Sequence, residues 1–285
     1  MNINIRRQHH VWRYYLESWA NNKQIYCKHG EKIFITNLIN IAVESNFYRI
    51  KKLTDADIKH LEYFKTKIKF EFLELDNYII NTFFSIINSN EDVELLLNNF
   101  EEKFYSEIER NSIKYIDLLK NCDGEFFKNY SERLEFIIYI STQYFRTKKF
   151  KEIYTELFNS PIHGDSRNLV NIIRQIFTFN YAVNLVYKNY NMQLLLNESE
   201  FPFITGDQPV INLNGDGKNP HDETVLYYPI TPKIAIKIFC FKKNDQAKII
   251  VNNDEIKYLN NKIYENSYLQ IYSNNEESLK IYNEL

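Results

Sequence analysis

The chain has 285 residues, of which 25% are charged and 44% are hydrophobic, so it is long enough to bury a substantial core and its composition argues against disorder. Lys and Arg number 35 against 37 Asp and Glu, which excludes a global basic field able to hold a nucleic-acid backbone. Any contact with a polyanion must therefore use a local patch.

The cysteines and the apolar runs bear on the compartment. Cys27, Cys122 and Cys240 lie far apart and are odd in number, which indicates neither a disulfide framework nor a structural zinc site. The first residues lack the apolar core of a signal peptide, and no run of about 18 apolar residues follows. The sequence therefore predicts a soluble protein of the cytoplasm with no membrane partner.

The amino-terminal region predicts a small β element. Within residues 11–37, a short aromatic segment is followed by two strands that turn at KHGEK, where Gly30 suits a hairpin. From about Leu53 to Phe158 the apolar residues recur with a period near 3.6, which predicts three or more long helices. Thr54 is a helix-start signal.

The second half of the chain changes from helix to strand. Gly124 in NCDGE is a plausible break between helices, and another helix is expected over residues 165–189. The remaining expected elements are strands within 192–199, 201–214, 225–240, 248–253 and 267–273, and a helix over about 254–266.

These elements predict a single α+β domain over residues 1–285. A helical bundle, residues 53–190, is inserted between an N-terminal β element, residues 1–50, and a C-terminal mostly antiparallel sheet, residues 191–285. By analogy with compact folds, we expect the two β-rich parts to meet in space.

Standard catalytic signatures are missing from the sequence, including GxGxxG, GxxxxGK[ST], HExxH and GxSxG. The stretch RRQHHVWRYYLESWA is unusual because histidine can act as general acid, general base or ligand near neutral pH. In an extended segment only one of His9 and His10 can face a given site. The alternative is a surface pair flanked by arginines.

Two polar side chains interrupt an apolar helix. Gln143 and Arg146 are three residues apart and therefore share one helical face. If that face is buried, both side chains need partners, because an unpaired buried charge is costly. If it is solvated, the face simply continues into the lysines that follow. The sequence leaves both interpretations open.

Several carboxylates could bind a divalent metal or share a proton: Glu44, and Glu71 with Glu74, which are three residues apart. Solvated helix faces produce such pairs often, and that is the simpler interpretation. Asp207 follows an apolar run and precedes a Gln-Pro pair, so it is either a metal ligand or base at a strand end, or a turn residue. With Asp216 and Lys218 it loosely matches the acid order of metal-dependent nucleases, although those two lie in a turn-like stretch.

In their order along nearly the whole chain, several segments resemble a bacterial family known as domain of unknown function 4238. The segments are QHHVWRYYLESWA, AVESNFYRI, QYFRT, FITGDQPV, YYPITPK and IKYLNNKIY. The chain departs from the family pattern at Trp12 and Lys148, where proline is frequent, and at Gly206 and Gln208, where the family has Ser and Asn.

The resemblance implies that polar residues from distant segments gather in one buried site, with Glu71 or Glu74 as a helical acid. The set is His9, Glu44, Gln143, Arg146, Asp207 and Asn260, with Gln208 beside it. Members of such families occur among phage-defence genes, so the resemblance implies an intracellular bacterial effector of antiviral defence, such as a toxin.

The first functional hypothesis is an enzyme that acts on nucleic acid or a nucleotide, such as a nuclease. His9 would transfer a proton, while Asp207 with Glu44 would bind a divalent metal or orient His9. Gln143, Arg146, Gln208 and Asn260 would bind the substrate, with the guanidinium on a phosphate. The alternatives are a sensor that binds a phage protein or small ligand without turnover, and a purely structural polar network.

Overall fold

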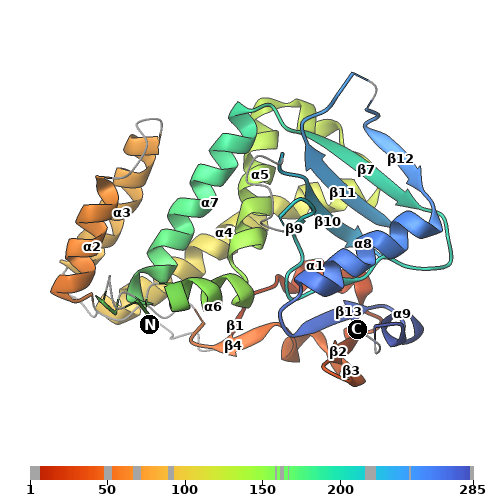
Figure 1. Cartoon of the computed structure of the whole chain (residues 1–285), viewed down its shortest axis with the longest axis horizontal. Helices are drawn as coiled ribbons and strands as arrows, with labels where there is room; N and C mark the ends of the chain where they lie inside the picture. Colours follow the sequence, from red (N-terminus) through yellow and green to blue (C-terminus); the bar gives the residue numbers. More distant parts are fainter. Residues whose placement is uncertain are drawn as a thin grey trace.

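The computed structural model describes residues 7–47, 53–66, 72–88, 93–157, 159–160, 164–165, 167–215, 223–243 and 245–282. Strands, then helices, then strands follow one another along the chain, which confirms the α+β prediction (Figure 1). Within these ranges no helix is long and apolar enough to span a membrane.

The amino-terminal part consists of short elements around one hairpin. They are β1 (Arg7–His9), α1 (Arg13–Leu16), η1 (Glu17–Trp19), β2 (Gln24–His29), β3 (Lys32–Asn37), η2 (Leu38–Asn40) and β4 (Val43–Ser45). The predicted β2–β3 hairpin is confirmed, and Gly30 takes a φ of +56° in its turn, a conformation that favours glycine. Strand β1 pairs antiparallel with β4 rather than with the hairpin.

The helical part contains the predicted long helices and several shorter ones. Its elements are α2 (Asp55–Lys65), α3 (Leu73–Ile87), α4 (Val93–Lys120), η4 (Glu125–Lys128), α5 (Tyr130–Phe145), α6 (Lys148–Leu157), η5 (Arg167–Leu169) and α7 (Val170–Tyr187), with two short strands, β5 (Asn159–Ser160) and β6 (Gly164–Asp165). Thr54 caps α2 and forms a reciprocal capping box with Asp57. The apolar run from 130 to 158 contains both α5 and α6, because the Thr147 hydroxyl accepts the backbone N–H of Phe150 and starts a new helix.

The carboxy-terminal part forms the main sheet and two helices. Its elements are β7 (Asn191–Asn197), β8 (Thr205–Gly206), β9 (Ile211–Asn212), β10 (Leu226–Thr231), β11 (Ile234–Phe239), β12 (Lys248–Val251), α8 (Asn253–Asn266), β13 (Gln270–Ser273) and α9 (Glu277–Lys280). The sheet order is β12-β7-β11-β10-β9, and only the β12–β7 pair is parallel. The sheet is therefore mostly antiparallel, as predicted.

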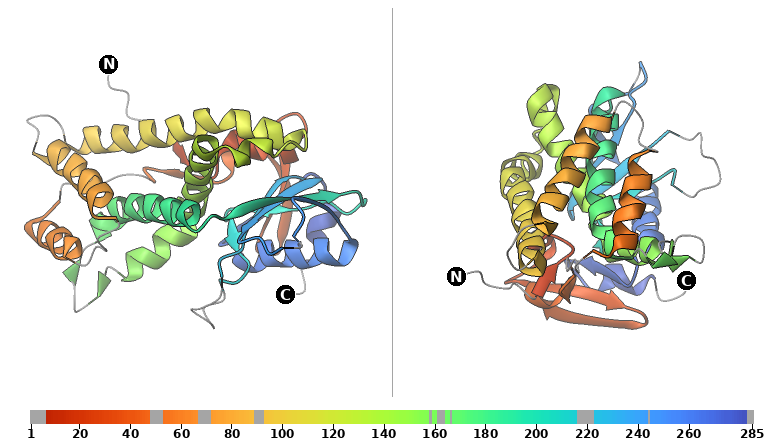
Figure 2. Two further views of the ribbon diagram at one scale, coloured as in Figure 1. Left: turned by 90° about the horizontal axis from the view of Figure 1, so that it is seen from above. Right: turned by 90° about the vertical axis from the view of Figure 1, so that its left-hand side faces the viewer.

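The two faces of this sheet are covered by different parts of the chain. Met192 and Leu194 on β7 belong to a core shared with α4, α5 and the α1 region, whereas Leu195 belongs to a core shared with α8. This alternation follows the two-residue period of a strand. Figure 2 shows the sheet between α8 on one side and the α4 and α5 helices on the other.

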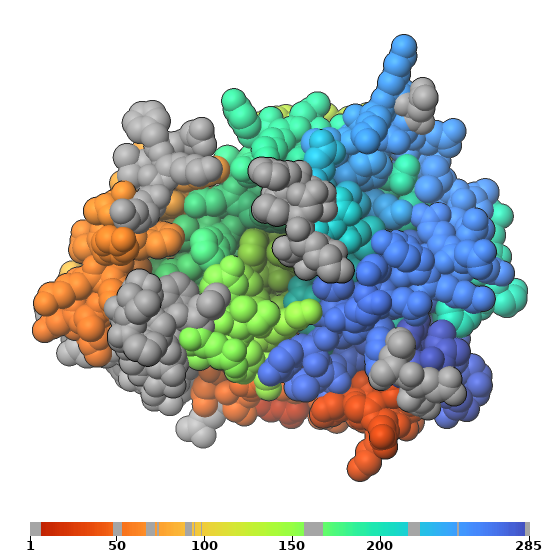
Figure 3. All heavy atoms as spheres, in the orientation of Figure 1, coloured from red at the N-terminus to blue at the C-terminus, as the bar shows by residue number. Residues whose placement is uncertain are grey.

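The two β-rich ends of the chain meet, as expected. Strand β13 pairs antiparallel with β2 on one side and β8 on the other, which gives a second sheet with the order β3-β2-β13-β8. Figure 3 shows the blue C-terminal residues packed against the red-orange amino-terminal hairpin. The pairing of β13 with β2 and β8 thereby fixes the amino-terminal hairpin relative to the carboxy-terminal part.

Candidate functional site

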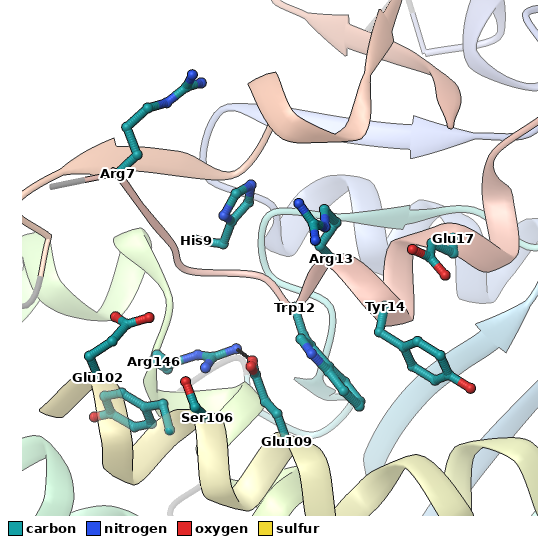
Figure 4. A pocket seen from close by; sticks show the side chains of 11 residues that line it. Arg7, His9, Trp12, Arg13, Tyr14, Glu17, Glu102, Ser106, Glu109 and Arg146 are labelled. Carbon is teal, nitrogen blue, oxygen red and sulfur yellow. Dashed lines mark hydrogen bonds and ion pairs between the residues drawn. The ribbon is translucent and has the colours of Figure 1, made fainter. Parts of the chain in front are cut away.

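A cavity of about 340 Å³ lies between the β1–α1 segment, α4 and the end of α5 (Figure 4). Its lining includes the predicted residues His9 and Arg146. The full set is Arg7, His9, Trp12, Arg13, Tyr14, Glu17, Glu102, Tyr105, Ser106, Glu109 and Arg146. Residues as far apart in the sequence as Arg7 and Arg146 thus line one cavity.

The alternation of strand β1 decides which side chains face which way. Arg7 pairs with Ser45 and His9 with Val43, and the His10 backbone N–H donates to the Ala42 carbonyl at 2.8 Å. The intervening Gln8 reaches Glu102 at 3.5 Å, between its Nε2 and the carboxylate Oε2. His9 and its sequence neighbours therefore point to different sides, as an extended segment requires.

His9 is held in its neutral form. Burial lowers the pKa of His9, and the Arg13 charge lowers it further, while a hydrogen bond to the backbone of Leu38 opposes both. A neutral imidazole has a ring nitrogen that can accept a proton at pH 7. In Figure 4 the His9 side chain lies near Arg13.

His10 lies in a drier environment than His9. It is 6% exposed, and its ring centroid lies 5.3 Å from that of Phe47. Burial, followed by the charges of Arg146 and Lys148, lowers the pKa of His10 to about 3. His10 is therefore neutral throughout the physiological range.

Arg146 is buried and paired, so the solvated interpretation of its helical face is excluded. Its Nη2 donates to Glu109 Oε1 at 2.5 Å and lies 3.5 Å from Gln143 Oε1. Only 2% of Arg146 is exposed, and its guanidinium carbon lies 5.2 Å from the centre of the Tyr105 ring. Burial raises the pKa of Glu109, and the adjacent guanidinium opposes that rise.

A second buried ion pair lies beyond Tyr105. Arg174 Nη2 contacts Glu101 Oε2 at 2.8 Å, and the other oxygen of that carboxylate accepts from Gln175 at 2.5 Å. The guanidinium carbon of Arg174 is 5.5 Å from the Tyr105 ring centre. Tyr105 therefore lies close to both buried arginines.

Sequence reasoning missed this second pair and Glu109. A signal was present: Glu101, Tyr105 and Glu109 are spaced four residues apart and share one face of α4. Arg174 also interrupts an apolar helix, NIIRQIF, in the same way as Arg146 interrupts its own. A charge inside an apolar helix needs a partner only if its face is buried, and the pattern does not say which carboxylate provides that partner.

Asp207 is buried at a junction of chain segments and does not line the cavity. Its carboxylate accepts the backbone N–H groups of Tyr268, Leu269 and Gln270 at 2.7, 2.7 and 3.1 Å. Burial raises the pKa of Asp207, and these three donors oppose the rise. The contacts fix the turn between α8 and β13.

The neighbouring Gln208 holds the α5–α6 junction. Its Oε1 accepts from the Thr147 hydroxyl at 2.5 Å, and its Nε2 donates to the carbonyl oxygens of Tyr144 at 3.1 Å and Val210 at 2.8 Å. Tyr144 and Thr147 lie on either side of Arg146 in the sequence. Gln208 therefore fixes the backbone that carries the arginine, from outside the cavity.

The other predicted site residues lie elsewhere. Asn260 bonds the backbone of Ile204 and Pro202, and Glu44 forms an ion pair with Lys148 at 2.9 Å. Gln143 is fully buried behind Arg146. Glu74 is exposed in the first turn of α3, and Glu71, Asp216 and Lys218 lie outside the described residues. Among the residues that are described, no group of three or more His, Cys, Asp or Glu could hold a metal ion.

Comparison with known proteins gives a family and no activity. No curated protein and no solved structure matches the chain. The model of one family, described as "Protein of unknown function (DUF4238)", matches residues 7–277, which include the lining of the cavity and all the segments on which the resemblance was based. The chain therefore belongs to the DUF4238 family.

Proposed function

We propose that the cavity beside His9 binds the phosphate of a nucleotide or of a nucleic acid, and that His9 transfers a proton during hydrolysis. The observation that carries the proposal is the position of a neutral histidine in one cavity with three arginines, Arg7, Arg13 and Arg146. Guanidinium groups are suited to phosphate, and an imidazole that is neutral at pH 7 is suited to accept a proton.

The two exposed arginines are the phosphate-binding groups in this proposal. Arg7 donates to the backbone of Ile39 at 3.0 Å, which fixes its side chain. Within the described residues, no carboxylate lies within ion-pair distance of Arg13. Arg146 is already neutralised by Glu109, so its part is to shape the floor of the cavity.

Two aromatic rings favour a nucleotide over free phosphate. Trp12 and Tyr14 both line the cavity, with ring centroids 5.0 Å apart. The Tyr14 hydroxyl is bonded to Asp117 at 2.5 Å, and Lys120 lies over its ring, so the ring is held in place. A base can stack on such a fixed aromatic surface.

Asp207, Gln208 and Asn260 have a positioning role in the proposal, together with Gln143. Their contacts fix the α5–α6 junction, the α8–β13 turn and Arg146. Glu44 acts through Lys148 in the same way. In the cell, we propose that the protein is a cytoplasmic effector of antiviral defence.

The test is binding and turnover of nucleotides and short single-stranded RNA and DNA, with Mg²⁺ and with EDTA. We expect Arg13→Ala to weaken binding at least about tenfold, because a charge-assisted contact is lost. His9→Ala should reduce turnover at least about a hundredfold with binding retained. The matched control is Arg110→Ala, an exposed arginine elsewhere on α4.

The pH profile separates a catalytic histidine from a structural one. Because the pKa of His9 is lowered, the rate should rise with pH through a midpoint below 6.5 and then level off. Tight binding without turnover would assign the site to a sensor. A chain that binds none of these ligands, or that keeps full activity in both variants, would refute the proposal.

A further inference from the structure

A second cavity, of about 590 Å³, lies between η4, the first turns of α5 and the edge of the main sheet formed by β7 and β12. It shares no lining residue with the cavity at His9. Its volume falls within the range of about 300–1,000 Å³ that is usual for small-molecule sites. The lining is Cys122, Asp123, Gly124, Glu125, Phe127, Lys128, Arg133, Asn191, Met192, Leu194, Phe241, Ala247 and Lys248.

One side of this cavity is apolar. Met192 and Leu194 are on the same face of β7, and both are mostly buried, as is Phe127 in η4. Gly124 permits the close approach of η4 to the sheet, because a Cβ atom there would lie 3.0 Å from the terminal methyl of Met192. A flexible thioether in such a wall adapts to aliphatic chains of different shape.

The polar side of the cavity carries an arginine whose bonding is incomplete. Arg133 Nη1 donates to Asn189 Oδ1 at 3.1 Å. Its Nε is buried and has no hydrogen-bond partner among the described residues. Because a guanidinium stays charged in proteins, and no carboxylate of the described residues lies within ion-pair distance of Arg133, this side chain favours an anionic ligand.

The charged residues of the lining are Asp123, Glu125, Lys128, Arg133 and Lys248, so positive charges outnumber negative ones by one. Lys128 forms an ion pair with Glu125 at 2.6 Å, and Asp123 Oδ1 accepts the backbone N–H of Glu125 at 2.9 Å. Lys248 is exposed, and the part of the chain that the structure describes places no carboxylate within ion-pair distance of it. Arg133 and Lys248 are therefore the cationic lining residues without a carboxylate partner in the described part of the chain.

We propose that this cavity binds an aliphatic carboxylate, with the alkyl chain against Met192, Leu194 and Phe127 and the carboxylate on Arg133. A carboxylate matches the planar geometry of a guanidinium and accepts charge-assisted hydrogen bonds from it. The apolar wall offers nothing to a second charged group, so the ligand has a single anionic end. The proposal does not depend on the function proposed for the cavity at His9.

A cysteine in the lining of the cavity can report whether a ligand is bound. Cys122 lines the cavity, is a free thiol and is half-buried, whereas Cys27 is buried. In a Cys240→Ser background, Cys122 is therefore the accessible thiol. A bound ligand should slow its alkylation by a maleimide.

The experiment compares decanoate with decanol, which has the same chain length and no charge. We expect decanoate to slow Cys122 alkylation at least fivefold and to bind at least tenfold more tightly than decanol by calorimetry. Arg133→Met should remove that difference between the two ligands. Met192→Trp should fill the cavity and abolish binding of both, and Arg110→Met, at an exposed site on α4, should change neither.

Circular dichroism of each variant separates loss of binding from loss of folding, and Leu194→Phe provides a milder filling variant if Met192→Trp fails to fold. Equal affinity for decanoate and decanol would overturn the assignment of Arg133. Decanoate binding that survives both filling variants, or no binding and no protection of Cys122, would overturn the site itself.

Discussion

At the scale of single residues, the buried charges around Tyr105 determine what the centre of the molecule can do. Arg146 and Arg174 are 2% and 0% exposed, and each is neutralised by a carboxylate from α4. Buried ion pairs often stabilise little relative to apolar residues, but removing one partner leaves a charge in a dry environment. These pairs therefore specify how α4 packs on α5 and α7.

The Arg146–Glu109 pair can be tested by a double-mutant cycle. We expect Arg146→Met and Glu109→Met each to lower the free energy of unfolding by about 3–5 kcal/mol, because each leaves the other charge buried. The double variant should lose much less than the sum, because no charge is left unpaired. Urea denaturation measures all three. Strictly additive losses would show that the two side chains do not interact, and exposed Arg110→Met should change stability by less than about 0.5 kcal/mol.

His10 gives the fold a defined pH dependence. Its pKa is about 3 in the folded chain against an ordinary value of 6.5, so the unfolded chain binds a proton that the folded chain does not. His10 therefore destabilises the fold as the pH falls from 6.5 towards 3. Between pH 7 and pH 5 it should remove about 2 kcal/mol.

Urea denaturation of the natural chain and of His10→Gln at pH 7, 6 and 5 checks this effect. The natural chain should lose about 2 kcal/mol more than the variant over that interval. Comparing the two slopes cancels the contributions of Glu102 and Glu109, whose raised pKa values act in the opposite sense. Parallel curves would show that His10 is not held neutral by the fold.

At the scale of elements, the segment Gly206–Pro209 contacts two distant parts of the chain. Asp207 binds the turn between α8 and β13, and Gln208 binds the junction of α5 and α6. This explains why the expected strand over 201–214 is present only as β8 and β9. The segment between them uses its side chains to bond backbone groups of distant elements, so it does not continue a ladder.

Asp207→Asn tests this joint. An amide has one acceptor oxygen and places an N–H₂ group where the carboxylate accepted a backbone N–H, so a buried donor loses its partner. We expect a loss of about 1–3 kcal/mol and faster hydrogen exchange at the amides of Tyr268, Leu269 and Gln270. Asp245→Asn, at an exposed aspartate that accepts one backbone N–H, is the control. Unchanged exchange at residues 268–270 would contradict the assigned role.

The elements themselves could be predicted well from the sequence, because their signals are local. The periodicity of α4, the capping of α2 by Thr54 and the Gly30 turn need no knowledge of the rest of the molecule. The sequence also placed Arg146 in an apolar helix, but it left open whether that face is buried or solvated. The partner Glu109 and the backbone contacts of Asp207 could not be predicted, because they depend on the packing of segments 37 and about 60 residues apart.

At the scale of the whole molecule, the cavity at His9 depends on elements from both ends of the chain. The hairpin that follows α1 is held by β13, about 245 residues later, and β13 in turn pairs with β8. Tyr272 on β13 is fully buried in the same core as Trp19 and Ile25. We therefore propose that residues 1–285 form one domain in which neither β-rich end folds without the other.

Deleting residues 270–285 tests this proposal. The deletion removes β13 from between β2 and β8, and it removes the buried side chains of Tyr272, Leu279 and Tyr282 from two cores. Each large buried side chain contributes roughly 1.5–3 kcal/mol, so their joint loss approaches the whole stability of an ordinary domain of 5–15 kcal/mol. We expect calorimetry to show no cooperative melting transition in the shortened chain, and Glu277→Ala with Lys280→Ala, which alters only exposed α9 ion pairs, to melt like the natural chain. If the shortened chain instead melts cooperatively within a few degrees of the natural chain, the proposal is wrong. The amino-terminal hairpin would then be stable without strand β13, held by the rest of the core alone.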